Sequence, residues 1–120
     1  MILGLATVIY QAKNLAAAKE WYTNAFGVKP YFDEPYYVGF NIGGYELGLT
    51  PDGAGVGPGG SIAYWRVPNI DRAVDDFLRA GATVVEPAHD VGGDIKVATV
   101  ADPDGNLIGI IENPHFELPE

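Results

Sequence analysis

Apolar residues recur at helical spacing in two stretches of the chain, residues 15–26 and residues 70–80. Side chains three and four positions apart lie on one face of an α-helix, so both stretches predict amphipathic helices. Asn14 precedes the first stretch and Asn69, 55 positions later, precedes the second, and a glycine follows each. Because asparagine is a favoured N-cap and glycine a favoured helix stop, these residues set the expected limits of both helices.

One strand-like run precedes each helix and three follow it, with tight turns predicted at residues 41–44 and 102–106. The expected strands are residues 5–12, 29–32, 36–42 and 45–50 with the first helix, and 61–67, 83–86, 95–101 and 107–112 with the second. The sequence therefore contains two copies of one βαβββ module. We expect a single domain, residues 1–120, with module 1 at about residues 3–50, a glycine-rich linker at 51–60, and module 2 at about residues 61–113.

Charge and composition narrow the choice of partners. The 16 acidic residues outnumber the 7 basic ones, which gives a formal net charge of −9. Nucleic acids and anionic membranes are bound through basic patches, so we expect neither as a partner. The absence of cysteine excludes disulfides, thiol nucleophiles and thiolate metal sites. No signal-peptide pattern and no long apolar run occur, so we expect a cytoplasmic protein.

Three motifs, taken in order, resemble those of a known family. They are Asn14-Leu15 … Trp21-Tyr22 … Phe26-Gly27, then Val67 … Asn69-Ile70 … Ala80-Gly81, and then Asp102-Pro103-Asp104-Gly105-Asn106-Leu107-Ile108. Over about residues 3–113 this arrangement resembles the vicinal oxygen chelate superfamily, which includes glyoxalase I, extradiol dioxygenases and bleomycin-resistance proteins. The resemblance implies an α+β fold, in which two βαβββ modules form a cupped mixed sheet with the helices on its outer face. It also implies a homodimer, and leaves open whether the modules pair within one chain or between two.

Alternation along the predicted strands divides their residues between the two faces of such a sheet. One set is uniformly apolar and suits the helices, whereas the other mixes polar, aromatic and glycine positions, as ligand clefts do. We predict that residues of the second set bind a small-molecule ligand, together with two tyrosines of the run 36–42. The predicted binding residues are Thr7, Ile9, Gln11, Tyr36, Tyr37, Glu46, Gly48, Ile62, Tyr64, Arg66 and Gly109.

The resemblance also implies a divalent metal, held in family enzymes by one His or Glu from each of four strands. Carried over to this sequence, the four positions are Thr7, Gly48, Ile62 and Gly109. None of these side chains supplies an imidazole or a carboxylate, which such ions need. The two histidines, His89 in an expected loop and His115 in the tail, are expected to be exposed. We therefore predict no metal and no cofactor.

The acidic and aromatic residues are expected in different parts of the fold. Glu46 is the one carboxylate expected near the cleft, whereas Glu112, three positions past Gly109, should face the other side. Trp21, Tyr22 and Trp65 are expected in the core between helix and sheet. For the three tyrosines among the predicted binding residues, cleft lining and ordinary cross-strand packing are equally good interpretations.

The leading hypothesis is a protein of this superfamily that binds or sequesters a small aromatic or cationic compound without a metal. An alternative is a lyase, isomerase or dioxygenase-like enzyme with a non-standard site around Glu46, Tyr64 and Arg66, where Tyr64 or Arg66 would orient an anionic intermediate. A third hypothesis is a dimeric scaffold whose cleft is filled by side chains. The identity of the ligand does not follow from the sequence.

Overall fold

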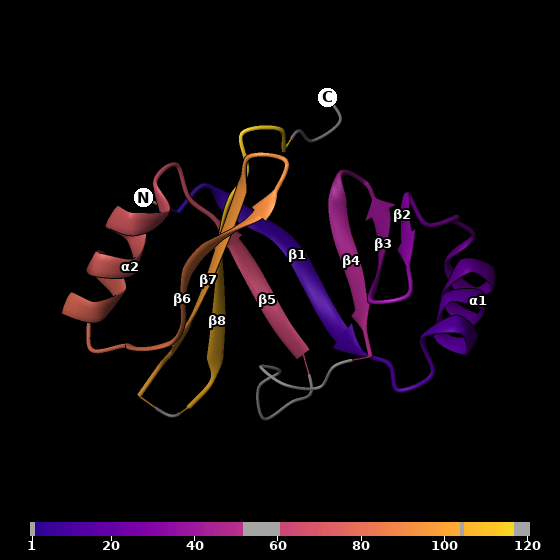
Figure 1. Cartoon of the computed structure of the whole chain (residues 1–120), viewed down its shortest axis with the longest axis horizontal. Coiled ribbons are helices and arrows are strands. Elements are labelled where there is room, and N and C mark those ends of the chain that lie inside the picture. The colour runs from indigo at the N-terminus through magenta and orange to yellow at the C-terminus, as the bar shows by residue number, and fades with distance from the viewer. Residues whose placement is uncertain (1, 52–60, 104, 117–120) are drawn as a thin grey trace.

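A computed structural model describes residues 2–51, 61–103 and 105–116 of the chain. Its elements are β1 (Gly4–Gln11), α1 (Leu15–Phe26), β2 (Phe32–Glu34), β3 (Tyr37–Ile42), β4 (Tyr45–Thr50), β5 (Ser61–Arg66), α2 (Ile70–Arg79), β6 (Thr83–Gly92), β7 (Ile95–Ala101) and β8 (Leu107–Glu112). All the strands belong to one mixed sheet in the order β2-β3-β4-β1-β5-β8-β7-β6 (Figure 1). The predicted α+β fold of two βαβββ modules is confirmed.

The two modules of one chain pair with each other through their first strands. Within module 1, β1 runs parallel to β4, and within module 2, β5 runs parallel to β8. The strands β1 and β5 are antiparallel neighbours, with Thr7 opposite Tyr64 and Ile9 opposite Ile62. The sequence left this pairing open, and the structure places it within a single chain.

Both helices begin and end close to the expected residues. The side chain of Asn14 accepts a hydrogen bond from the backbone N–H of Ala17 at 3.0 Å, and that of Asn69 accepts one from Arg72 at 3.1 Å. Each bond satisfies a backbone donor that the first turn of a helix leaves free. Gly27, at φ 70°, ends α1 in the left-handed conformation that favours glycine. Neither helix is long and apolar enough to cross a membrane, among the residues the structure describes.

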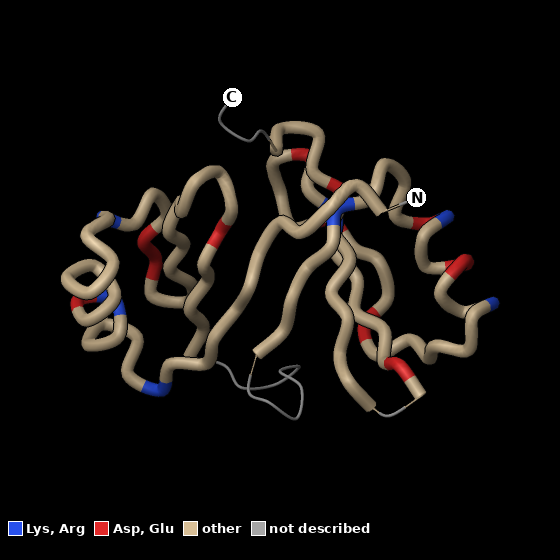
Figure 2. Tube along the Cα trace, turned by 180° about the vertical axis from the view of Figure 1, so that it is seen from behind, with Lys and Arg blue, Asp and Glu red and all other residues tan. Residues whose placement is uncertain are grey.

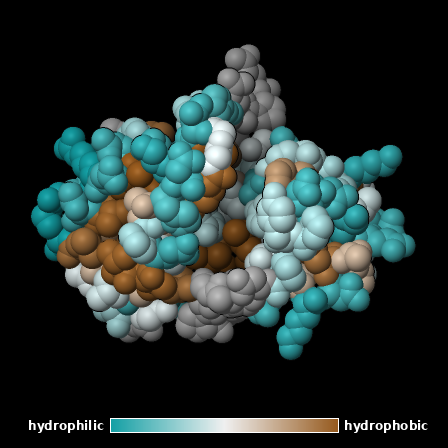
Figure 3. All heavy atoms as spheres, viewed as in Figure 1, coloured by the Kyte–Doolittle hydropathy of each residue, from teal (hydrophilic) through white to brown (hydrophobic). Residues whose placement is uncertain are grey.

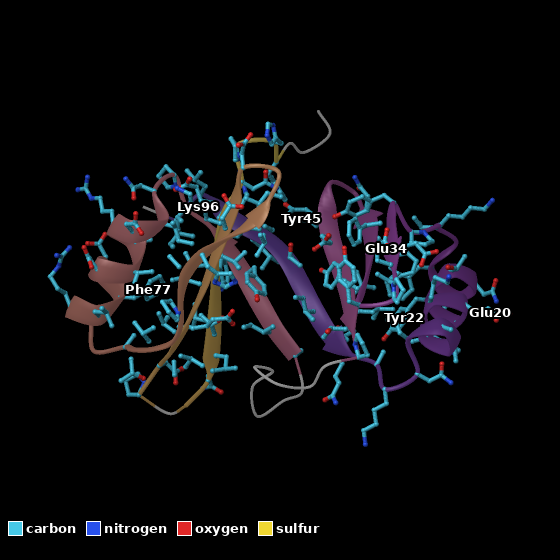
Figure 4. The ribbon with its side chains drawn as sticks, viewed as in Figure 1. Glu20, Tyr22, Glu34, Tyr45, Phe77 and Lys96 are labelled. Carbon is cyan, nitrogen blue, oxygen red and sulfur yellow. The ribbon has the colours of Figure 1, made fainter. Side chains whose placement is uncertain are left out.

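Each module has its own hydrophobic core beneath its helix. In module 1, α1 packs on β3 and β4, whose buried residues include Phe40 and Leu49. In module 2, α2 packs on β6, β7 and β8, where Ile70, Val100 and Ile110 are buried. Figure 4 shows the labelled Tyr22 and Phe77 between their helices and the sheet. The core position predicted for Tyr22 is confirmed.

Two aromatic residues expected in the core lie at the surface instead. Trp21 is 61% exposed and Trp65 is 38% exposed. Trp65 is on the outer face of β5, and the helices pack on β3, β4 and β6–β8, to either side of the central strands β1 and β5. Trp21 lies at the flank of α1, with its ring edge-on to Tyr22 at 4.8 Å between centroids. The sequence pattern identified the outer face but did not show where along it the helices would lie.

Two strands differ from the prediction by more than one residue at an end. The run expected at residues 29–32 forms strand only from Phe32 to Glu34, because the register with β3 pairs those residues with residues 37–39. The strand expected to stop at residue 86 continues through Pro87 to Gly92, and it includes His89, which was expected in a loop. An edge strand tolerates proline, and β6 is an edge strand with register shifts on both sides of Pro87. Except for Pro51, the predicted linker lies outside the described residues.

Candidate functional site

A cleft of about 670 Å³ lies between the two modules on the face of the sheet opposite the helices. Its walls come from all four strands of module 1 and the residue before β2, from all four strands of module 2, and from the segment after β8. Figure 3 shows the surface hollowed between the two halves of the molecule, with hydrophobic atoms inside the hollow. A volume of this size suits a small organic molecule.

Strand register brings the polar residues of the cleft into one row across the sheet. Thr7 lies opposite Glu46 on one side and opposite Tyr64 on the other. Tyr64 in turn pairs with Gly109, and Gly109 pairs with Thr99. Because paired residues of neighbouring strands point to the same face, residues far apart in the sequence meet on the cleft side of the sheet.

A tyrosine–glutamate cluster, Tyr31, Tyr37 and Glu46, forms one wall of the cleft. The Tyr37 hydroxyl donates a hydrogen bond to Glu46 Oε1 at 2.7 Å, and the Tyr31 hydroxyl donates one to Glu46 Oε2. Two glycines that face each other across β3 and β4, Gly39 and Gly48, make room for these side chains. A Cβ atom on Gly39 would lie 2.8 Å from Glu46 Oε2, and one on Gly48 would lie 2.6 Å from Tyr37 Cζ and closer still to its hydroxyl.

Burial keeps the tyrosines of the cleft in their protonated form. The pKa of Tyr37 is raised far above its ordinary value, by burial first, and then by the charge of Glu46 and the hydrogen bond to it. The same causes raise the pKa of Tyr31. Burial also raises the pKa of Tyr64, although a hydrogen bond with Thr99 acts in the opposite direction. These hydroxyls therefore act as hydrogen-bond donors rather than as bases or nucleophiles at neutral pH.

The residues at the four family metal positions do not fit a metal. Thr7 and Ile62 are buried in the floor of the sheet, at 7% and 5% exposure, and offer at most one hydroxyl. At Gly48 the space that a ligand side chain would need holds the Tyr37 ring, and at Gly109 it holds the Tyr64 ring, 2.6 Å from a Cβ atom placed there. In the part of the chain that the structure describes, no group of three or more His, Asp or Glu residues is arranged to hold a metal.

The segment that follows β8 closes one end of the cleft. The Phe116 ring lies over the Arg66 guanidinium, with 4.3 Å from Arg66 Cζ to the ring centroid, and its centroid is 6.3 Å from that of Tyr45. Figure 4 shows the labelled Tyr45 on the side of β4 that faces module 2. His115 Nε2 lies 3.2 Å from a carboxylate oxygen of Asp94, in the turn between β6 and β7. Phe116 therefore bridges the two modules.

The structure brings together about half of the predicted binding residues. Those that line the cleft are Thr7, Ile9, Tyr36, Tyr37, Glu46 and Tyr64. Gly48 and Gly109 lie beneath tyrosine rings, Ile62 is buried, and Gln11 and Arg66 are outside the lining. Glu112 faces the helix side as expected, because its Oε1 accepts a hydrogen bond from the backbone N–H of Ile70 at 2.9 Å. Ligand binding by any of these residues stays a prediction.

Several lining residues were missed in the sequence. The ones that shape the cleft most are Tyr31, Phe32, Tyr45, Asn113, His115 and Phe116. For Tyr31 the sequence did contain a signal. The predicted turn at residues 41–44 sets Gly39 opposite Gly48, and two paired glycines leave space on the sheet that a large side chain such as Tyr31 can fill. His115 was expected to be an exposed tail residue; its side chain is 65% exposed, yet it borders the cleft. No pattern in the tail indicated that it would fold back.

Comparison with known proteins gives relatives in sequence and in structure. Two mycobacterial proteins, each named "Putative glyoxylase CFP32", from Mycobacterium bovis and Mycobacterium tuberculosis, are 30% identical over 113 residues. The match covers 83% of this chain but only 42% of those proteins, so this chain spans less than half of their length.

Solved structures of low sequence identity share the fold. A methylmalonyl-CoA epimerase in complex with methylmalonyl-CoA and NH4+ has a TM-score of 0.78 at 15% identity, covering 99% of this chain and 100% of the epimerase. The epimerase of Mycobacterium tuberculosis has a TM-score of 0.73 at 20% identity, with 93% and 89% covered. A sequence model described as the Glyoxalase/Bleomycin resistance protein/Dioxygenase superfamily matches residues 4–110. This chain therefore belongs to the Glyoxalase/Bleomycin resistance protein/Dioxygenase superfamily.

Proposed function

We propose that this protein binds a small, flat, cationic organic compound in the cleft, without the help of a metal ion. The observation that carries the proposal is the Glu46 carboxylate, which faces an aromatic cleft and accepts hydrogen bonds from two tyrosine hydroxyls. Within the described ranges, no Lys, Arg or His lies within ion-pair distance of it. The negative charge of Glu46 in this aromatic cleft attracts a cation, and in our proposal the ligand supplies that cation.

The aromatic walls favour the same class of ligand. Rings from both modules surround Glu46, and the faces of aromatic rings attract cations through their electron density. Tyr31 and Tyr37 use only part of the acceptor capacity of the carboxylate, which has about four lone-pair sites, so a ligand N–H or ammonium group still finds an acceptor. Acidic residues are spread over both modules, as Figure 2 shows, which also favours the approach of a cation.

A direct test uses benzyltrimethylammonium as the cationic probe and benzyl alcohol as the neutral one, with binding measured by isothermal titration calorimetry. We expect the cation to bind more tightly, and Glu46→Gln to weaken its binding by about tenfold or more, equivalent to about 1.4 kcal/mol. Affinity for benzyl alcohol should change little in the variant. EDTA should leave both affinities unchanged.

Glu20→Gln is the matched control, because it removes the same charge from α1, where Figure 4 shows Glu20 pointing away from the sheet. This variant should bind both probes as the unmodified protein does. Equal affinity for the two probes, or an equal loss of cation binding in both variants, would overturn the proposal. Cation binding that disappears with EDTA would overturn its metal-free part.

We also propose that two copies of this chain associate through the outer face of β1 and β5. Tyr10 and Trp65, 40% and 38% exposed, lie on that face between the areas on which the two helices pack. Exposed aromatic residues of this kind are enriched in protein interfaces. In sedimentation velocity experiments the unmodified protein should be a dimer, and Tyr10→Ser with Trp65→Ser should give monomers. A monomeric unmodified protein would disprove this association.

A further inference from the structure

The guanidinium of Arg66 is a cation for which the described part of the chain provides no hydrogen-bond acceptor. Its Nε atom is buried and has no hydrogen-bond partner, and the guanidinium makes no ion pair with any described carboxylate. The contact that the guanidinium does make is with the face of the Phe116 ring. A buried N–H donor without an acceptor is costly, and native structures rarely keep one without a reason.

The position of Arg66 links it to the cleft. Arg66 lies two residues after Tyr64 on β5, so both side chains are on the same face of the sheet, which is the cleft side. Phe116, whose ring covers the guanidinium, is itself a lining residue of the cleft. On the other side, a Cβ atom on Gly4 would lie 3.7 Å from Arg66 Nη2, so the guanidinium rests on the start of β1. The group therefore lies behind the Phe116 ring at one end of the cleft.

Glu46 on β4 and Arg66 on β5 lie apart on the cleft face of the sheet. Glu46 is two strands away from Tyr64 through Thr7, and Arg66 is two residues farther along β5. With strand spacings of about 4.8 Å and a rise of about 3.3 Å per residue, their Cα atoms are about 12 Å apart. The Glu46 carboxylate thus lines the cleft and the Arg66 guanidinium lies behind its Phe116 wall, and neither pairs with a charged group among the described residues.

We propose that Arg66 receives a carboxylate of the ligand, so that the compound bound in this cleft is an aromatic zwitterion. This inference rests on the proposed function, in which Glu46 and the surrounding rings hold the cationic end. The planar guanidinium presents several N–H donors in a geometry that matches a carboxylate, and its orphaned Nε is one of them. Because Nε is buried, the carboxylate reaches it after the Phe116 ring has turned aside.

The experiment compares benzyltrimethylammonium with zwitterions that carry the same cation and a carboxylate at the para position, attached directly or through one or two methylene groups. We expect at least one zwitterion to bind the unmodified protein about tenfold more tightly than the cation alone, by calorimetry. Arg66→Gln should abolish that advantage and leave the affinity for the cation unchanged. Arg72→Gln, which removes an equal charge from α2, should keep the advantage.

Two further variants protect the test against misfolding and against an indirect effect of Phe116. Arg66→Lys retains the charge but not the planar fork of donors, so it should keep only part of the advantage. Phe116→Ala uncovers the guanidinium and should keep the full advantage or increase it. The inference is overturned if no zwitterion exceeds the cation, or if Arg66→Gln retains the advantage. In either case the proposed function still stands if Glu46→Gln weakens binding of the cation, and it fails with the inference if Glu46→Gln changes no affinity.

Discussion

Gly48→Ala is expected to lower the free energy of unfolding by about 2 kcal/mol, although it adds a single methyl group. The added Cβ atom would lie 2.6 Å from Tyr37 Cζ, a distance at which one of the two groups must move. Tyr37 is held by its hydrogen bond to Glu46 and by neighbouring rings, including Phe32 at 6.1 Å between centroids, so it has little freedom to give way. Urea unfolding followed by circular dichroism measures the change.

A double-mutant comparison shows whether the tyrosine ring is the cause. In a Tyr37→Ser background the space above residue 48 is open, so Gly48→Ala should be neutral, or slightly stabilising because alanine restricts the unfolded chain. If the methyl group costs as much in that background as in the unmodified protein, the Tyr37 ring does not fill the position. In that case the Tyr37 ring would not displace a ligand side chain at Gly48 either.

The helix limits and the alternation of the strands were predictable because local sequence rules determine both. The asparagine caps at Asn14 and Asn69 form the hydrogen bonds that their positions in the sequence predicted. Alternation along β4 and β8 likewise placed Leu47 and Ile110 in the two cores. Each of these features depends on a few neighbouring residues, so a single sequence is enough to show it. The domain limits and the cytoplasmic location stay predictions.

The cleft was harder to predict because its shape depends on side chains that cross between elements. Tyr31 precedes a strand that the sequence misplaced, and its hydroxyl reaches Glu46 on a strand two positions away in the sheet. Phe116 comes from a segment without any periodic pattern, and its contact with Arg66 joins residues 50 positions apart. Glycines at the family metal positions indicated lost ligands, but they did not show that Tyr37 and Tyr64 would fill the space.

Alkaline pH should destabilise this protein more than the titration of ordinary surface groups explains. The pKa values of Tyr31, Tyr37 and Tyr64 are raised in the folded state, chiefly by burial. Above pH 10, near the ordinary pKa of tyrosine, the unfolded chain therefore releases tyrosine protons that the folded protein keeps. The stability is fully present below pH 10 and falls as the pH rises above it. At pH 11 Tyr37 alone should account for a loss of about 1.4 kcal/mol relative to pH 8, and Tyr31 and Tyr64 add to the loss in the same direction.

Phenylalanine variants separate this effect from the titration of lysines, which is common to all of them. Tyr37→Phe should reduce the loss between pH 8 and pH 11 by about 1.4 kcal/mol, Tyr64→Phe should also reduce it, and the double variant should lose less stability than either single variant. Urea unfolding at the two pH values gives the free energies, and absorbance at 295 nm reports the tyrosinate formed in the folded protein. Ionisation of these tyrosines stabilises the unfolded chain and not the folded protein. The buried hydroxyls therefore determine how this part of the free energy of unfolding falls with pH. If the double variant loses as much stability as the unmodified protein, the fold does not protect these two hydroxyls, and the role of Tyr37 as a permanent donor to Glu46 is wrong.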